Sequence, residues 1–95
     1  MIVYHRTFAA KQILAEGFRD AEGTYLTANV YRGVWVADSP LDINEGANGD
    51  RLLSIDIPEL VIADFEWIEE MKPYREWLVP AELLNQYPVV EETDT

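Results

Sequence analysis

The chain has 95 residues and a net charge of −11, with 18 acidic residues, seven basic residues, one histidine and no cysteine. This length corresponds to one domain near the small end of what can bury a core, and three tryptophans and five tyrosines help to close that core. The composition excludes disulfides, cysteine catalysis and thiolate metal sites, and we predict no metal site.

The acidity is concentrated in the second half of the chain. Residues 1–41 hold four acids and four bases, whereas residues 42–95 hold fourteen acids and three bases. Proteins bind nucleic acid through lysine and arginine side chains, which displace the counterions of the phosphates. Because this chain is strongly acidic, we do not expect direct binding to bulk DNA or RNA. The first residues lack the apolar run of a signal peptide, and no apolar run approaches the roughly 18 residues that span a bilayer. We therefore expect a cytoplasmic protein without membrane contact.

The first third of the chain predicts a strand followed by a helix. Residues 2–5 are β-prone, and Thr7 is a suitable N-cap for a helix over 8–16 with apolar residues at helical spacing. Gly17 supplies a stop signal for that helix. The residues that follow are typical of a loop, with a short strand at 24–27.

The rest of the chain predicts more strands and a second helix. Four segments are β-prone or alternate between apolar and polar residues: 33–37, 52–57, 65–68 and 76–79. Pro80 is well placed at the start of a helix over 81–86. Short strands with two short helices indicate an α+β fold. We expect a single domain over residues 1–87 and a flexible acidic tail over residues 88–95.

Three segments, taken in chain order, carry a family resemblance. They are Tyr4-His5-Arg6-Thr7 with the helix and Gly17-Phe18 that follow, then Gly33–Asp38, and then Glu76–Val79. In this order they resemble the ADP-ribosyltransferase superfamily, especially its poly(ADP-ribose) polymerase-like branch and the related tRNA 2′-phosphotransferases. That family opens with a strand bearing His-Gly-Ser or His-Gly-Thr, and its catalytic glutamate begins a later strand. The resemblance spans residues 2 to about 87 and implies a small split β-sheet sandwich.

The resemblance implies a substrate and a reaction. The substrate is NAD⁺, and the reaction cleaves its nicotinamide–ribose bond and transfers ADP-ribose to an acceptor that the sequence does not identify. Glu76 would orient the ribose 2′-hydroxyl and stabilise the positive charge that develops on the sugar, as carboxylates do in glycosidases. His5 would bind a hydroxyl of the adenosine-side ribose. Both side chains are then expected to open onto one cleft.

Further residues are implied to bind the dinucleotide. Thr7 would contact the nicotinamide amide and Trp35 would line the nicotinamide pocket, although Thr7 as a helix cap and Trp35 as a core residue are also consistent with the pattern. Arg6 or Arg32 would meet the pyrophosphate, and Arg19 is a third candidate for that role. The family places a stacking tyrosine shortly after the second segment, where this chain has no aromatic residue over 40–44. Tyr25 or Tyr31 are the available substitutes.

Three functions remain open on the sequence. The first is an ADP-ribosyltransferase or NAD⁺ glycohydrolase that uses Glu76 and His5. The second is a catalytically inactive module that keeps the fold and binds a nucleotide or a protein. The third is an acidic protein that binds a basic partner, as an inhibitor or nucleic-acid mimic. A second copy of the chain is a further expected partner, because a domain this short gains core area by pairing with itself.

Overall fold

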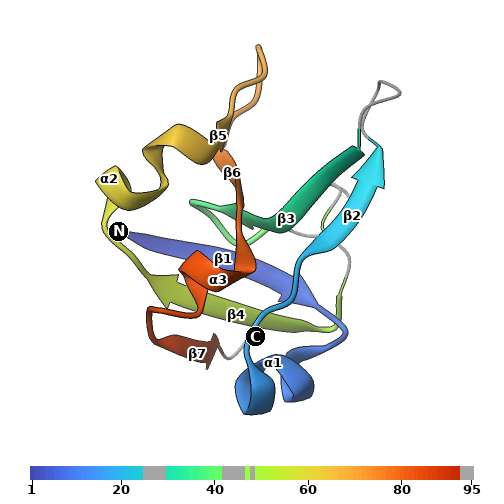
Figure 1. Ribbon diagram of the computed structural model, residues 1–95. Helices are drawn as coiled ribbons and strands as arrows, with labels where there is room; N and C mark the ends of the chain where they lie inside the picture. Colours follow the sequence, from blue (N-terminus) through green and yellow to red (C-terminus); the bar gives the residue numbers. More distant parts are fainter. Residues whose placement is uncertain (25–29, 42–46, 48, 93–95) are drawn as a thin grey trace.

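The computed structural model describes residues 1–24, 30–41, 47 and 49–92, and Figure 1 shows the arrangement of the chain. The strands are β1 (Ile2–Thr7), β2 (Ala21–Thr24), β3 (Val30–Ala37), β4 (Arg51–Asp56), β5 (Glu66–Trp67), β6 (Glu76–Val79) and β7 (Val89–Glu92). The helices are α1 (Ala10–Glu16), α2 (Glu59–Ile62), the 3-10 turn η2 (Ala63–Phe65) and α3 (Ala81–Leu84). The predicted α+β class is confirmed.

The strands form one antiparallel sheet in the order β5-β6-β3-β1-β4-β7, and β2 pairs with β3 outside this path. β1 is paired with β4 along its full length, from Ile2 opposite Asp56 to Thr7 opposite Arg51. Between β1 and β3, in contrast, only Tyr4 and Ala37 are in register. The sheet is therefore weakly joined at its centre, between a β1-β4-β7 half and a β2-β3-β6-β5 half.

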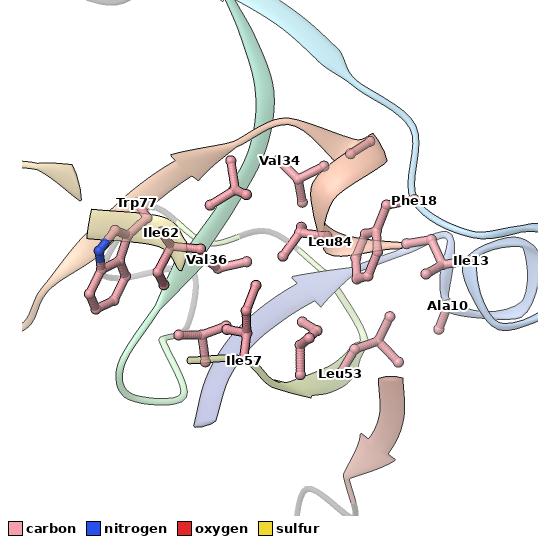
Figure 2. Close-up of a cluster of buried hydrophobic side chains, with 14 residues drawn as sticks. Ala10, Ile13, Phe18, Val34, Val36, Leu53, Ile57, Ile62, Trp77 and Leu84 are labelled. Atoms are coloured by element: carbon pink, nitrogen blue, oxygen red, sulfur yellow. The ribbon is translucent and has the colours of Figure 1, made fainter. Parts of the chain in front are cut away.

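One face of the sheet carries the hydrophobic core. Successive side chains of a strand point to opposite faces, and the core takes alternate residues from four strands. These residues are Val3, Val34, Val36, Leu53, Ile55, Trp77 and Val79. Ala10 and Ile13 of α1, Ile62 of α2, and Ala81 and Leu84 of α3 pack against them (Figure 2). The three short helices thus cover the same face of the sheet.

The turn after α1 is held by a residue distant in sequence. Gly17 has a φ of 91°, which is strained for other residues, and its N–H donates to the carbonyl of Ile13 at 2.8 Å. Asn85, just after α3, accepts a hydrogen bond from the Phe18 N–H at 2.7 Å and donates one to the Phe18 carbonyl at 3.0 Å. This pair of bonds fixes Phe18 over the core.

Several element boundaries differ from the sequence prediction. The expected helix over 8–16 begins at Ala10, and the strand expected over 24–27 is found at Ala21–Thr24, with residues 25–27 outside the described part. The expectation of two helices missed α2. The expectation of a flexible tail from residue 88 is wrong for Val89–Glu92, which form β7 and pair with β4. Across the described residues, no helix is long and apolar enough to cross a bilayer.

Candidate functional site

His5 lies where the two halves of the sheet separate. It is two residues from the core residue Val3 and in register with Leu53, so its side chain is on the core face of β1. The imidazole Nδ1 is 2.7 Å from the backbone carbonyl oxygen of Trp35 on β3. The ring also meets Phe18 edge to face, with centroids 5.5 Å apart. The side chain of His5 therefore links β1 to β3 where the backbone ladder between them is almost absent.

The hydrogen bond to Trp35 fixes the roles of the two ring nitrogens. A carbonyl oxygen accepts only, so Nδ1 must carry the proton and donate it. Burial lowers the pKa of His5 below its usual value because it disfavours the charged ring, and the hydrogen bond to Trp35 opposes this effect only in part. At neutral pH the ring is uncharged, and Nε2 is left as a hydrogen-bond acceptor.

A pocket of about 300 Å³ lies beside His5, between β1, α1 and the start of β2. Its lining combines apolar side chains with a few polar ones: His5, Thr7, Ala9, Gln12, Ile13, Glu16, Gly17, Phe18, Arg19, Ala21 and Val34. This volume is at the lower end of the range for small-molecule sites, which extends from about 300 to 1,000 Å³. The pocket accommodates a nucleoside-sized group rather than a whole dinucleotide.

Thr7 shares the pocket-facing side of β1 with His5. Its hydroxyl oxygen accepts a hydrogen bond from the Ala9 N–H at 2.9 Å, which supports the turn into α1. The hydroxyl proton remains a donor that a ligand can use. Gly49 approaches Thr7 so closely that an added Cβ would lie 2.2 Å from the Thr7 nitrogen. Thr7 is thus restrained by its hydrogen bond with Ala9 and by the close approach of Gly49.

Charge at the pocket is balanced. Arg19 and Glu16 both line it, and the Arg19 Nη2 lies 3.3 Å from the Glu16 carboxylate. Both side chains are largely exposed, so the pair contributes little to stability and separates easily. Arg19 is therefore a cation that an incoming anionic group can recruit.

Glu76 lies on the other face of the sheet, and the expectation that it shares a cleft with His5 is wrong. Its neighbour Trp77 is fully buried in the core, so the alternation of β6 turns Glu76 away from that core. Glu76 is in register with Ala37 and Trp67, and its carboxylate binds the ammonium of Lys72. Lys72 also lies 3.4 Å from Glu69. The structure does not bring the two expected catalytic residues together.

Three predicted binding residues, Trp35, Arg6 and Arg32, are not among the residues that line this pocket. The Trp35 ring packs edge to face on Trp67 at 5.4 Å, on the face of Glu76, and only its carbonyl reaches His5. Arg6 points to that face too, and its Nε donates to the carbonyl of Leu41 at 2.6 Å. Arg32 is exposed on β3, in register with Glu22. Tyr25 and the side chain of Tyr31 lie outside the described residues.

Sequence reasoning missed the apolar lining of the pocket. The sequence pattern points to Phe18 only as part of the Gly17-Phe18 pair, and it does not single out Gln12 or Val34. For Phe18 the sequence does carry a signal, the Gly17-Phe18 pair. A helix stop followed at once by a large aromatic residue directs that ring back over the helix. In the described part of the chain, no group of three or more His, Asp or Glu side chains is arranged to hold a metal ion.

No family model, no curated protein and no solved structure matches this chain. The resemblance to ADP-ribosyltransferases therefore rests on the three sequence segments, and the site has to be interpreted from its own geometry.

Proposed function

We propose that this protein is a catalytically inactive ADP-ribosyltransferase-like module that binds the nucleoside part of NAD⁺ or a related nucleotide in the pocket beside His5. The observation that carries the proposal is the pocket itself. It lies against the one histidine that the family resemblance singles out, at the weak junction between β1 and β3. The order of the three family-like segments supports the same assignment.

The chemistry of the lining suits a nucleoside. The neutral His5 offers Nε2 as an acceptor for a ribose hydroxyl, and Thr7 retains a hydroxyl proton to donate. Ile13, Phe18 and Val34 supply apolar surface for a base. Arg19, at the edge of the pocket, would exchange Glu16 for a phosphate oxygen. Each part of a nucleotide thus has a counterpart of the correct polarity.

Transfer of ADP-ribose needs more than this pocket. Breaking the nicotinamide–ribose bond calls for a carboxylate directed at the sugar on which positive charge develops, and the carboxylate that lines this pocket, Glu16, is largely exposed and paired with Arg19. Glu76, the residue that the resemblance assigns to this role, faces the opposite side of the sheet and is bound by Lys72. We therefore propose binding without turnover. The hypothesis of an active ADP-ribosyltransferase is the alternative that the experiment must exclude.

The proposal is tested with variants that fill the pocket without disturbing the core. Ala21 is exposed at the pocket edge, so Ala21→Phe would block entry, and Ala63→Phe places the same ring on an exposed residue of η2 as a matched control. Calorimetric titration with ADP-ribose and NAD⁺ is expected to show at least tenfold weaker binding for Ala21→Phe and unchanged binding for Ala63→Phe. His5→Phe, which keeps a ring beside Phe18 but removes the acceptor, should also lose at least tenfold.

Nicotinamide release from NAD⁺ is measured on the same proteins. The proposal predicts no release above the protein-free rate. Release that disappears in Glu76→Gln would instead establish the transferase or glycohydrolase reading. Equal affinity of wild type and Ala21→Phe for both ligands would reject the pocket as the binding site.

A further inference from the structure

The β5–β6 hairpin projects from the body of the protein (Figure 1). Apolar side chains are exposed at its tip. Ile68 is 82% exposed and Met71 is 98% exposed, and both lie in the turn between the two strands. Met71 has a φ of 68°, a left-handed conformation that is uncommon for residues other than glycine. Backbone strain of this kind persists only where the surrounding structure imposes it. The turn thus adopts an uncommon conformation, and its two apolar side chains cover little of the described chain.

One side of the hairpin is braced by a group centred on Lys72. Its ammonium binds the carboxylate of Glu76, lies 3.4 Å from Glu69 and sits 5.3 Å from the centre of the Tyr74 ring. Glu69 in turn accepts a hydrogen bond from the Trp67 indole at 2.8 Å. A single exposed ion pair is worth little, but a connected group restrains several side chains together.

The other side is braced by Arg75. Its guanidinium donates to Glu66 of β5 at 2.8 Å and to Glu59 of α2 at 3.1 Å, and it stacks over the Trp77 ring at 4.9 Å. The Arg75 N–H donates to Asp38 at 3.0 Å, so the hairpin is also tied to the end of β3. With both sides restrained, the tip is preorganised, and binding to it would cost little conformational entropy.

The charge around the tip identifies the kind of partner. The hairpin carries four glutamates, at positions 66, 69, 70 and 76, against Lys72 and Arg75, and both of these bases are bound to acids. A surface of this sign repels nucleic acid, anionic lipid and a second copy of this chain, which itself carries −11. Methionine adapts readily to apolar surfaces of varied shape. The class of partner that complements both the charge and the apolar residues of the tip is a basic protein segment with exposed apolar residues.

We propose that the β5–β6 tip, defined by Ile68 and Met71 with Glu70 between them, docks a protein segment that presents an apolar stripe flanked by lysine or arginine. Ile68 and Met71 provide the apolar anchors. The net negative charge that the hairpin keeps, with four glutamates against two bases, provides orientation and speed of association. This surface belongs to the hairpin and shares no residue with the pocket beside His5. The proposal therefore stands or falls independently of nucleotide binding.

The test uses a synthetic amphipathic helical peptide of leucine and lysine as the probe. Its titration into the ¹⁵N-labelled protein is expected to shift the amide signals of residues 66–76. Ile68→Ser and Met71→Ser should each weaken binding at least fivefold, and the double variant more. Phe8→Ser, which removes another strongly exposed apolar side chain near α1, is the matched control and should leave the affinity unchanged. Raising the salt concentration should weaken binding to every protein that retains it.

Three results would overturn the proposal. The first is absence of binding by the wild-type protein. The second is a response spread over the whole acidic surface, or an equal loss in Phe8→Ser, because either would indicate non-specific attraction of a cationic peptide. The third is self-association of the wild type in sedimentation that Met71→Ser abolishes, because this would assign the tip to a second copy of the chain.

Discussion

His5 uses its two ring nitrogens for different purposes. Nδ1 donates to the Trp35 carbonyl and joins two strands that share one backbone register pair, while Nε2 stays an acceptor for the pocket. The neutral form of the ring therefore serves both the link between β1 and β3 and the acceptor that faces the pocket. Protonation would leave the bond to Trp35 in place but would turn Nε2 into a donor and put a charge into a poorly solvated site.

The stability of the protein should therefore depend on the charge of His5. Its pKa is lowered on folding, so the unfolded chain binds a proton at higher pH than the folded chain. The free energy of unfolding is expected to be at its full value above the unfolded pKa of about 6.5 and to decline below it, until the folded pKa is passed. Each unit of pKa depression corresponds to about 1.4 kcal/mol.

Urea unfolding of the wild type and of His5→Phe at pH 7.5 and pH 5.5 measures this effect. The carboxylates titrate in both proteins, so the difference between them isolates the histidine. The wild type should lose more stability on acidification than His5→Phe. Equal losses would show that His5 is not held in its neutral form.

Gly49 is a second residue with a local structural role, because it lies against the backbone of Thr7. An added Cβ would lie 2.2 Å from the Thr7 nitrogen and 2.5 Å from the Thr7 carbonyl carbon, and these atoms belong to backbone that cannot rotate away. We expect Gly49→Ala to cost about 2 kcal/mol or more, in the range that accompanies forced backbone shifts. Thermal unfolding measures the loss. An unchanged unfolding midpoint in Gly49→Ala would mean that the close approach to Thr7 does not constrain this position.

At the scale of elements, β7 illustrates what local sequence does not reveal. Val89–Glu92 has two apolar and two acidic residues after Pro88, a pattern that also describes a solvated tail. Its strand state depends on β4: Glu91 binds Arg51, and Glu92 accepts a hydrogen bond from the Ser54 hydroxyl at 2.6 Å. The bond from Arg51 lowers the pKa of Glu91, which is consistent with a carboxylate held in place. The strand state of Val89–Glu92 therefore depends on partners that lie 38 and 40 residues away in sequence.

Removal of β7 should accordingly destabilise the protein. Truncation after Tyr87 exposes the edge of β4 and removes the packing of Val89 on the core. We expect a loss of roughly 2–4 kcal/mol, of the size seen when several buried contacts are deleted. Chemical denaturation of the truncated chain measures it. A stability equal to that of the full chain would mean that residues 88–95 behave as the tail that the sequence suggests.

Elements with strong local signals were predicted closely. β6 occupies the predicted residues 76–79, because a short apolar run ends there at Pro80, and that proline precedes α3 as expected. The predictions for His5 and for Glu76 had different outcomes. The involvement of His5 in a pocket followed from its motif, whereas the position of Glu76 depended on which face of β6 the core takes. The burial of Trp77 settles that face, and the alternation of Glu76 with Trp77 and Val79 already favours it, but nothing local in the sequence states which face carries the pocket.

At the scale of the whole molecule, the charge of −11 is the dominant electrostatic feature. Self-repulsion of so many like charges opposes compaction, and exposed ion pairs such as Arg51–Glu91 recover little of this cost. Salt screens both effects, but the repulsion extends over more pairs of charges. The midpoint of thermal unfolding should rise between 0.02 and 0.5 M sodium chloride, as the Debye length shortens from about 20 Å to about 4 Å. A falling midpoint would mean that the ion pairs contribute more than the repulsion.

The same scale connects the two proposed surfaces. The pocket beside His5 lies in the half of the sequence with balanced charge, and the docking tip lies in the acidic half. An anionic nucleotide and a basic protein segment would then approach different parts of the molecule without competing.

A ¹H–¹⁵N shift map during titration with NAD⁺ tests the central claim most directly, because it reports each face of the sheet separately. The account predicts saturable shifts at Thr7, Gln12 and Phe18 and unmoved signals at Glu76 and Lys72. Shifts centred on Glu76, or no saturable shift at any residue of the His5 pocket, would contradict it.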